Sequence, residues 1–231
     1  MLSLPEADFD ALRPSLIFER LPHHANLHEA GEDLLSVYFP NRGLISLVVV
    51  TREGKTVEAA MVGHEGVVGA SALLGLKRFP FRAVVQIGGD CFRIAVEAIQ
   101  RIFENSMGLQ AELSRYAIFQ AMEAEQIAAC NRLHGIEQRL ARWLLMMQDR
   151  VDYSSFLITH DFLAAMLGTD RPSVSLAASD LQKKGAIEYT RGAIRIASRP
   201  MLIDVTCECY QVMQQFRSFE ESGPVRDGDV F

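Results

Sequence analysis

The side chains of this chain best suited to chemistry are cations and hydroxyls grouped between residues 159 and 199. Arginine and lysine neutralise phosphates, arginine can donate two hydrogen bonds to a guanine edge, and serine binds phosphates and bases alike. This segment holds six Lys or Arg and four Asp or Glu, a net charge of +2, whereas the whole chain carries −6. Such a local footprint indicates contact with nucleic acid, with weak and salt-sensitive nonspecific affinity.

Two short helices joined by a tight turn are expected to position these side chains. Thr159 is suited to cap the first helix and Gly168 to end it. Asp170 is suited to cap the second helix, and Gly185 to end it. The apolar residues of both helices follow helical spacing and would form their inner faces: Phe162, Leu163, Met166 and Leu167 in the first, and Val174, Ala177, Ala178 and Leu181 in the second.

A β-hairpin is predicted next, because apolar residues alternate on both sides of the turn Thr190-Arg191-Gly192. Two helices followed by a basic hairpin describe a winged helix-turn-helix, whose second helix enters the DNA major groove. The alternative is a small structural pair of helices with a solvated polar face. The outward residues of the second helix are short hydroxyls and cations, suited to phosphates and base edges: Arg171, Ser173, Ser175, Ser179, Gln182 and Lys183.

This stretch also resembles the helix-turn-helix of the Crp/Fnr family of bacterial transcription regulators. The matching residues, in family order, are Leu167, Gly168, Arg171, Ser173, Val174, Leu181, Gly185 and Ile187. The resemblance implies that Arg171 contacts a guanine. Where the family next has Glu and Arg, this chain has Pro172 and Leu176, so its preferred half-site should differ. The expected DNA contacts are Thr159, Asp170, Arg171, Pro172, Ser173, Ser175, Leu176, Ser179, Lys183 and Arg191.

The chain from Leu21 to Ala95 consists of short apolar runs separated by turn residues, which predicts short strands in an antiparallel sandwich, barrel or roll. It resembles the β-roll of cyclic-nucleotide-binding domains. In that family a Gly-Glu pair holds the ribose, and an Arg followed by Ser or Thr and Ala holds the cyclic phosphate. Here these positions are Gly69-Ala70 and Phe81-Arg82-Ala83. We therefore interpret the pocket as retired from cyclic nucleotides or altered for another ligand.

A long helical stretch runs from Leu109 to Met147, with an interruption at Gly135. The resemblance implies that family members dimerise through this helix and hinge near Gly135. Residues spaced by three and four could form one seam against a second copy: Leu113, Ala117, Gln120, Ala124, Ile127 and Asn131. The alternative is a helix packed on its own roll.

The expected fold is α+β in four parts. Residues 1–104 form an N-terminal antiparallel, jelly-roll-like β-roll that senses a ligand or only serves as a scaffold. Residues 105–134 form the dimerisation helix, and residues 135–216 form the winged helix-turn-helix. A short helix is expected within residues 6–20 and a final helix over residues 199–216. Residues 217–231 are expected to form a flexible, acid-rich tail.

Four cysteines and six histidines raise the question of a metal site. No CxxC motif or disulfide spacing is present, and a helix would point Cys207 and Cys209 in different directions. The resembled family has a haem-sensing branch, but the histidines lack usable spacing apart from His24 and His28, which are not in a predicted helix. We therefore expect buried or idle thiols, no metal and no cofactor, with haem or redox sensing as an alternative.

The remaining features limit the class of protein. No apolar run reaches the length of a membrane span, and the N-terminus lacks a secretion signal, so a cytoplasmic protein is expected. No phosphate loop or ordered catalytic triad is visible, so no enzyme is expected. The prediction is a homodimeric transcription regulator that binds palindromic double-stranded DNA without cyclic AMP, with RNA polymerase as a further partner and an unknown effector. The rival is a ligand-binding module that acts on a protein partner.

Overall fold

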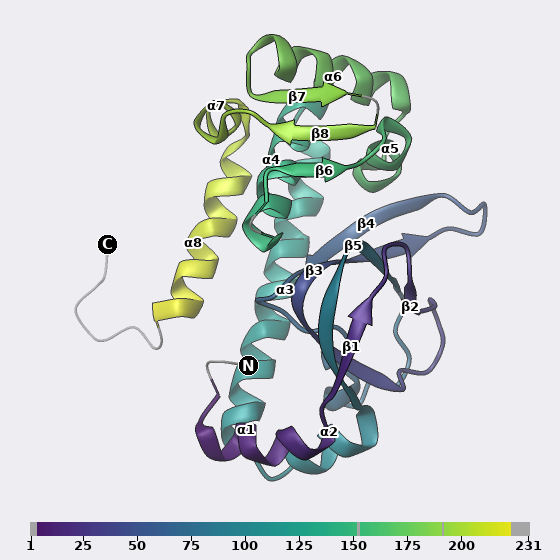
Figure 1. Cartoon of the computed structure of the whole chain (residues 1–231), viewed down its shortest axis with the longest axis vertical. Coiled ribbons are helices and arrows are strands. Elements are labelled where there is room, and N and C mark those ends of the chain that lie inside the picture. Colours follow the sequence, from purple (N-terminus) through teal and green to yellow (C-terminus); the bar gives the residue numbers. More distant parts are fainter. Residues whose placement is uncertain (1–3, 152, 191, 223–231) are drawn as a thin grey trace.

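A computed structural model describes residues 4–151, 153–190 and 192–222, with side chains to residue 217. A long helix, α3 (Met107–Leu133), runs along the molecule, with a β-sheet on one flank and a smaller domain at its upper end (Figure 1). The α+β class expected from the sequence is therefore confirmed. Among the described residues, no helix combines the length and apolarity needed to cross a bilayer.

The chain begins with α1 (Glu6–Leu12) and a 3-10 turn, η1 (Arg13–Ser15). The expected helix to residue 20 is too long, because strand β1 (Ile17–Leu21) begins there instead. Pro14 explains the early end, since a proline has no N–H to continue the helical ladder. The missed strand pairs antiparallel with β5 (Arg82–Ala95).

The roll is an antiparallel sheet of order β1-β5-β3-β4, in which β2 (Asn26–His28) also pairs with β5. Its central strands, β3 (Ser36–Val50) and β5, are longer than the short strands predicted, and β4 (Thr56–Val62) completes the sheet. They pass through apparent turn signals as bulges. At Gly43, φ is +90° and a Cβ would lie 2.5 Å from the Ile87 carbonyl oxygen. Glycine therefore permits the close approach of the two strands there.

The helical part starts with α2 (Val96–Phe103). Helix α3 follows, and His134 and Gly135 connect it to α4 (Ile136–Val151). The predicted interruption is thus present: the Gly135 carbonyl accepts the first hydrogen bond of α4 from the Arg139 amide at 3.0 Å. Arg150, near the end of α4, lies back against α3 and the roll. Its Nη2 and Nε each lie 2.8 Å from a carboxylate oxygen, of Glu123 and Glu65 respectively.

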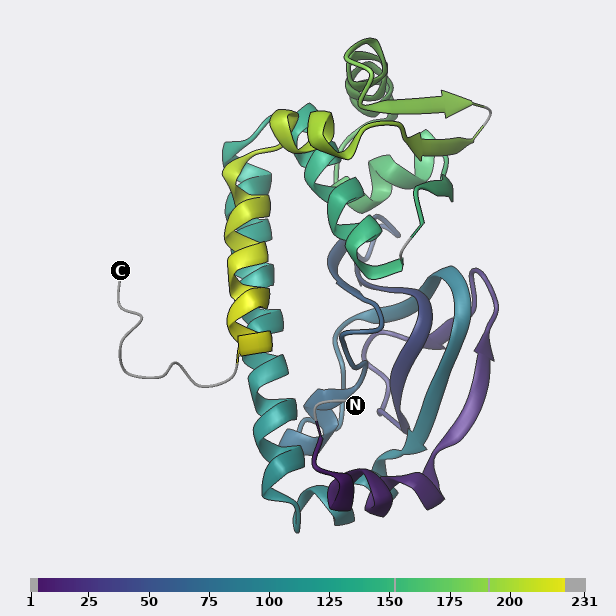
Figure 2. The ribbon, with the colours of Figure 1, turned by 60° about the vertical axis from the view of Figure 1, so that its left-hand side comes forward.

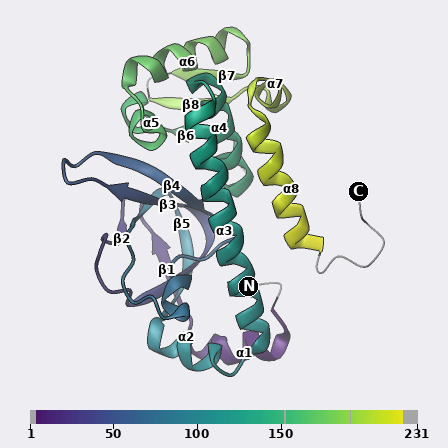
Figure 3. The same cartoon turned by 180° about the vertical axis from the view of Figure 1, so that it is seen from behind.

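The smaller domain contains β6 (Ser155–Leu157), α5 (His160–Leu167), α6 (Arg171–Lys183), β7 (Ile187–Thr190) and β8 (Ala193–Ile196), with sheet order β6-β8-β7. Two helices follow where one was expected: α7 (Arg199–Val205) and α8 (Glu208–Ser222). α8 continues past residue 216, the end expected for the folded part, because no breaker occurs before Gly223. It runs beside α3, on the side away from the sheet (Figure 2), and Figure 3 shows the same arrangement from behind.

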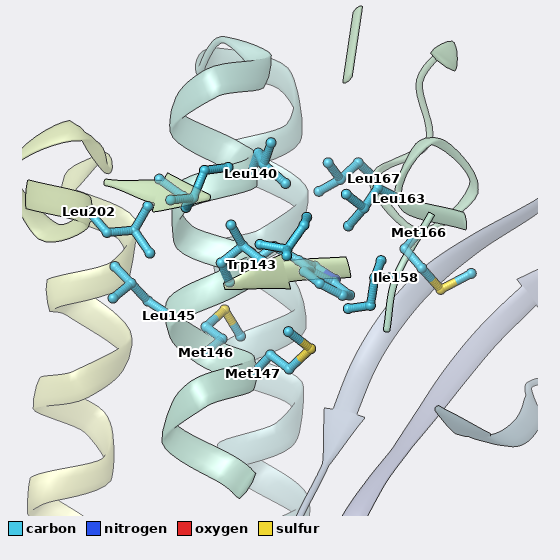
Figure 4. Packing of buried hydrophobic residues seen from close by; sticks show 14 of the residues in the cluster. Leu140, Trp143, Leu145, Met146, Met147, Ile158, Leu163, Met166, Leu167 and Leu202 are labelled. Carbon is cyan, nitrogen blue, oxygen red and sulfur yellow. The ribbon is translucent and has the colours of Figure 1, made fainter. Parts of the chain in front are cut away.

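Two clusters of buried apolar residues support this arrangement. One fills the roll and includes Leu113 of α3. The other, drawn around Trp143 in Figure 4, joins α4 and the smaller domain to Leu44, Val48 and Met61 of the roll. The Trp143 Nε1 donates a hydrogen bond of 2.7 Å to the buried Glu58 of β4. The two parts of the chain therefore share a core.

Candidate DNA-binding interface

Helices α5 and α6 begin at the caps that the sequence predicts. The Thr159 hydroxyl accepts the Phe162 amide at 3.2 Å, and Asp170 Oδ1 accepts the Ser173 amide at 2.8 Å. Gly168 ends α5 with φ +61°, in the left-handed region that favours glycine. These contacts fix where α5 begins and ends and where α6 begins. Thr159 and Asp170 therefore act within the structure as caps.

Helix α6 buries one side and exposes the other. Val174, Ala177, Ala178 and Leu181 are buried against the shared core. The opposite face is exposed and holds Arg171, Pro172, Leu176, Ser179, Gln182 and Lys183. Leu176 is 64% exposed, which is unusual for a leucine in a helix with a well-filled inner face. This face of α6 is turned to solvent.

Two of the predicted contacts are engaged inside the domain. The Ser173 hydroxyl donates to Asp170 Oδ2 at 2.9 Å, within the cap of α6. The Ser175 hydroxyl lies 2.8 Å from His160 Nδ1, and the His160 ring stacks on Tyr189 of β7 with centroids 4.1 Å apart. Ser173 and Ser175 are half-buried. Both serines therefore position α6, and their hydroxyls are already bound in the structure.

His160 is a residue whose role the sequence analysis missed, because it counted this histidine only as a metal candidate. It connects the first turn of α5 with α6 and with strand β7 of the hairpin. Burial, followed by the nearby Arg171 charge, lowers the pKa of His160. The ring is therefore neutral near pH 7, and its contacts with Ser175 and Tyr189 are those of an uncharged imidazole.

The cations of the interface are held by weak surface ion pairs. Arg171 Nε lies 3.6 Å from Asp161, and Lys183 Nζ lies 2.9 Å from Asp180, with both cations well exposed. On the hairpin, Arg195 pairs with Glu188 across β7 and β8. Arg191, predicted at the tip of the wing, lies outside the described residues. Since exposed pairs contribute about 0–1 kcal/mol, a phosphate or base can replace the carboxylates at little cost.

The residues of the predicted effector pocket lie at two places on the roll, with Gly69 beside Ser36 at the start of β3 and Arg82 paired with Val48 near its end. Gly69 begins the 3-10 turn η2 (Ala70–Leu74) with φ +94°, and Ala70 is buried. Ala83 is buried in β5. Phe81 packs edge-on against Phe79, with ring centroids 5.2 Å apart. Arg82 donates to Glu29 at 2.9 Å. Arg82, the cation of the predicted pocket, is thus paired with a carboxylate of the same chain.

Four of the six residues predicted to form a dimer seam have contacts within their own chain. Leu113 is 7% exposed in the core of the roll, and Ile127 packs against the shared core. Asn131 accepts a hydrogen bond from Arg139 at 3.1 Å, and the Gln120 amide lies 3.4 Å from the Tyr116 hydroxyl. The residues on the opposite side of α3 are exposed, and they are Ala111, Arg115, Ile118, Met122, Glu125, Ala129 and Leu133. Leu113 therefore belongs to the core of its own roll, because a 3-4 spacing locates a face of a helix without saying which neighbour covers it.

The comparisons with known proteins agree with this geometry. Residues 138–205 match the family model of the Crp-like helix-turn-helix domain. A Crp/Fnr family regulator from Eubacterium rectale has a similar structure, with a TM-score of 0.71, 17% identity, and coverage of 87% of this chain and 94% of that chain. FixK2 from Bradyrhizobium japonicum is similar with a TM-score of 0.70 and 16% identity, and the match covers 83% of this chain and 98% of FixK2. TTHA1359, a CRP/FNR family regulator from Thermus thermophilus, is similar with a TM-score of 0.68 and 19% identity, and the match covers 82% of this chain and 97% of TTHA1359.

No curated protein sequence matches the chain. Its fold is nevertheless shared with these regulators over most of their length and most of its own. The chain thus has the fold of the Crp/Fnr transcription regulators, and its residues 138–205 form a Crp-like helix-turn-helix domain.

Proposed function

We propose that this protein is a DNA-binding transcription regulator of the Crp/Fnr type that acts as a homodimer. The observation that carries the proposal is α6, which is capped at Asp170, anchored by a buried inner face and exposed along its polar face. Helices with this setting enter the major groove. In this proposal Arg171 and Leu176 contact bases, while Lys183 and the wing contact phosphates. The protein would act in the cytoplasm, with RNA polymerase as a further partner.

The second copy is proposed to bind the exposed stripe of α3, defined by Ala111, Arg115, Ile118, Met122, Glu125, Ala129 and Leu133. Successive positions are three or four residues apart, as in a coiled-coil seam. Ile118 and Leu133 are 63% and 74% exposed in the single chain. Helix-turn-helix proteins bind two half-sites as two-fold dimers, which gives this apolar stripe a matching occupant.

Selection of bound sequences from random DNA with the purified full-length protein tests the proposal. We expect enrichment of a two-fold symmetric site whose half-sites are centred about 34 Å apart, one helical turn. A half-site unlike that of regulators with Glu and Arg at the positions of Pro172 and Leu176 is expected as well. Absence of any enriched sequence would contradict the proposal. It would favour a regulatory module that acts on a protein partner.

We further propose that DNA binding does not require cyclic AMP. Ala70 supplies no carboxylate for a ribose hydroxyl, and Arg82 is occupied by Glu29. A phosphate buried there without a free cation would remain unpaired, at a cost of several kcal/mol. Calorimetric titration with cyclic AMP and cyclic GMP should give no heat of binding. Micromolar binding of either nucleotide that Arg82→Ala abolishes would contradict this and assign Arg82 the phosphate.

A further inference from the structure

Four potential metal ligands gather where α8 begins beside the end of α3. Cys130 and His134 are one helical turn apart on α3, and Cys207 and Cys209 flank the first residue of α8. The Cys130 and Cys207 sulfurs are 3.5 Å apart, and Cys209 Sγ lies 3.6 Å from His134 Nδ1. All four ligand atoms lie within 4.8 Å of one another. The three cysteines are buried and His134 is nearly so.

The sequence analysis missed this group for an identifiable reason. It placed Cys207 and Cys209 inside one helix, where residues two apart diverge. In the structure the chain is extended at Thr206, with ψ 163°, and α8 begins only at Glu208. Cys207 therefore precedes the helix, and both thiols turn toward α3. The four-residue spacing of Cys130 and His134 was a usable signal, since residues four apart share a helical face.

We propose that Cys130, His134, Cys207 and Cys209 bind one Zn²⁺ ion. Three thiolates and one imidazole are a common donor set of closed, tetrahedral structural zinc sites. With Zn–S near 2.3 Å and Zn–N near 2.0 Å, the edges of such a tetrahedron measure about 3.5–3.8 Å. The 3.6 Å between Cys209 Sγ and His134 Nδ1 matches the S–N edge of about 3.5 Å. The 3.5 Å between the Cys130 and Cys207 sulfurs is about 0.3 Å shorter than an S–S edge, and no separation in the group exceeds 4.8 Å, so small side-chain shifts would close the four atoms around an ion. A single ion fits the spacing, whereas a cluster of several irons would hold its ligands farther apart.

Three further side chains, Glu208, Gln126 and Arg142, surround the four potential ligands. Glu208 Oε1 lies 3.2 Å from His134 Nε2, which places the His134 Nδ1 atom toward the cysteines. Carboxylates commonly orient ligating histidines in this way. The Gln126 amide donates to Cys209 Sγ at 3.1 Å. Near Cys130 lies the buried guanidinium of Arg142, whose Nε has no hydrogen-bond partner among the described residues.

Charge also favours a bound dication. Three thiolates and Zn²⁺ carry a net charge of −1, which the Arg142 guanidinium neutralises. An ion at this position would join α8 to the last turn of α3, next to the break at Gly135. It would therefore fix the C-terminal helix to the long helix and stabilise the folded chain by mass action.

The test uses the purified full-length protein under reducing conditions. Elemental analysis should give one zinc per chain after incubation with Zn²⁺ and desalting. Replacement by Co²⁺ should give the intense visible bands of tetrahedral cobalt and a thiolate charge-transfer band. Cys209→Ser and His134→Gln should each weaken zinc binding by about 100-fold or more. This exceeds the roughly 10- to 100-fold loss that is typical when a residue that only hydrogen-bonds a ligand is replaced. Cys91→Ser, a buried cysteine of the roll, is the matched control and should bind as the wild type does.

Several outcomes would overturn the proposal. The measurement on the wild-type protein does not depend on how the variants fold. A zinc content well below one per chain, with no spectrum of tetrahedral cobalt, would by itself overturn the proposal. Zinc binding that survives both substitutions would place the ion elsewhere. A Cys130–Cys207 disulfide in protein isolated without reductant, together with no metal uptake after reduction, would assign the cysteines to redox chemistry instead.

Discussion

At the scale of single residues, the exposed face of α6 separates two kinds of contact. Arg171 is the first residue after the cap Asp170, and its side chain is held only by a 3.6 Å pair with Asp161. Lys183 lies at the other end of the helix, beside Asp180. Arginine at a helix start can reach a guanine edge, whereas a lysine at the far end meets the DNA backbone. Their loss should therefore have different signatures.

Arg171→Ala should reduce discrimination at one base pair of each half-site by about 1–3 kcal/mol. Lys183→Ala should weaken binding to all sequences alike and lower the slope of log affinity against log salt by about 1. Gel-shift titration on the selected site, on its single-base variants and on random DNA measures both effects. An equal loss on specific and random DNA in the Arg171→Ala protein would make Arg171 a phosphate contact.

Glu58 is the residue whose protonation should matter to stability. It is buried between the roll and α4, where Trp143 donates to its Oε1 and the Ser46 hydroxyl lies 2.6 Å from its Oε2. Burial raises the pKa of Glu58 to about 7. The same Ser46 hydroxyl also hydrogen-bonds the Gln86 carbonyl oxygen. Because one hydroxyl proton cannot serve both oxygens, a proton on Glu58 completes this chain of hydrogen bonds.

The sign of the resulting pH dependence follows from the two states. Between about pH 4.5 and 7 the unfolded chain loses the Glu58 proton and the folded chain keeps it. The free energy of unfolding should therefore fall as pH rises through this window, by about 3 kcal/mol in total. Glu58→Gln, which mimics the protonated acid, should remove this term. Urea unfolding of both proteins at pH 5 and pH 8 measures it, and a difference between them that is independent of pH would contradict the prediction.

At the scale of elements, the turn between α5 and α6 depends on Gly168. Its φ is +61°, and an added Cβ would lie 3.1 Å from Val57 Cγ2 of the roll. Gly168→Ala should lower the free energy of unfolding by about 1–2 kcal/mol and weaken DNA binding. Gly54→Ala is the control, since Gly54 has φ +78° in the turn between β3 and β4 with open space around it. It should show the strain without the loss of DNA affinity, as measured by unfolding and gel shift; equal DNA affinities would leave Gly168 a purely local role.

Helices α5 and α6 could be predicted from the sequence because each carries its own boundary signal. Thr159, Gly168 and Asp170 cap or end helices by local hydrogen bonds and backbone angles, which depend little on distant residues. The bulged strands could not be predicted, since Gly43 resembles a turn until its neighbour Ile87 is placed. The partner of each helix face is equally nonlocal. This is why Leu113 was assigned to a second copy and lies in the roll.

At the scale of the whole molecule, the exposed stripe of α3 should hold two copies together. Ile118→Asp would place two like charges near the two-fold axis and should give a monomer, with a large loss of affinity for a palindromic site. Leu76→Asp is the matched control, because Leu76 is 61% exposed on the roll, far along the chain from the stripe. Sedimentation velocity distinguishes the two variants. A dimer of the Ile118→Asp protein at micromolar concentration would place the interface elsewhere.

The core shared by the roll and the winged domain has a consequence for how the protein can be divided. Leu44, Val48 and Met61 of β3 and β4 pack in the same cluster as Trp143 and Leu163. A fragment that starts at α4 would expose this apolar surface to water, so it should aggregate when expressed alone. Chimaeras that exchange the roll for that of a relative would need to exchange the facing residues as well. The two halves of the chain thus form a single cooperative unit, which has to be engineered as a whole.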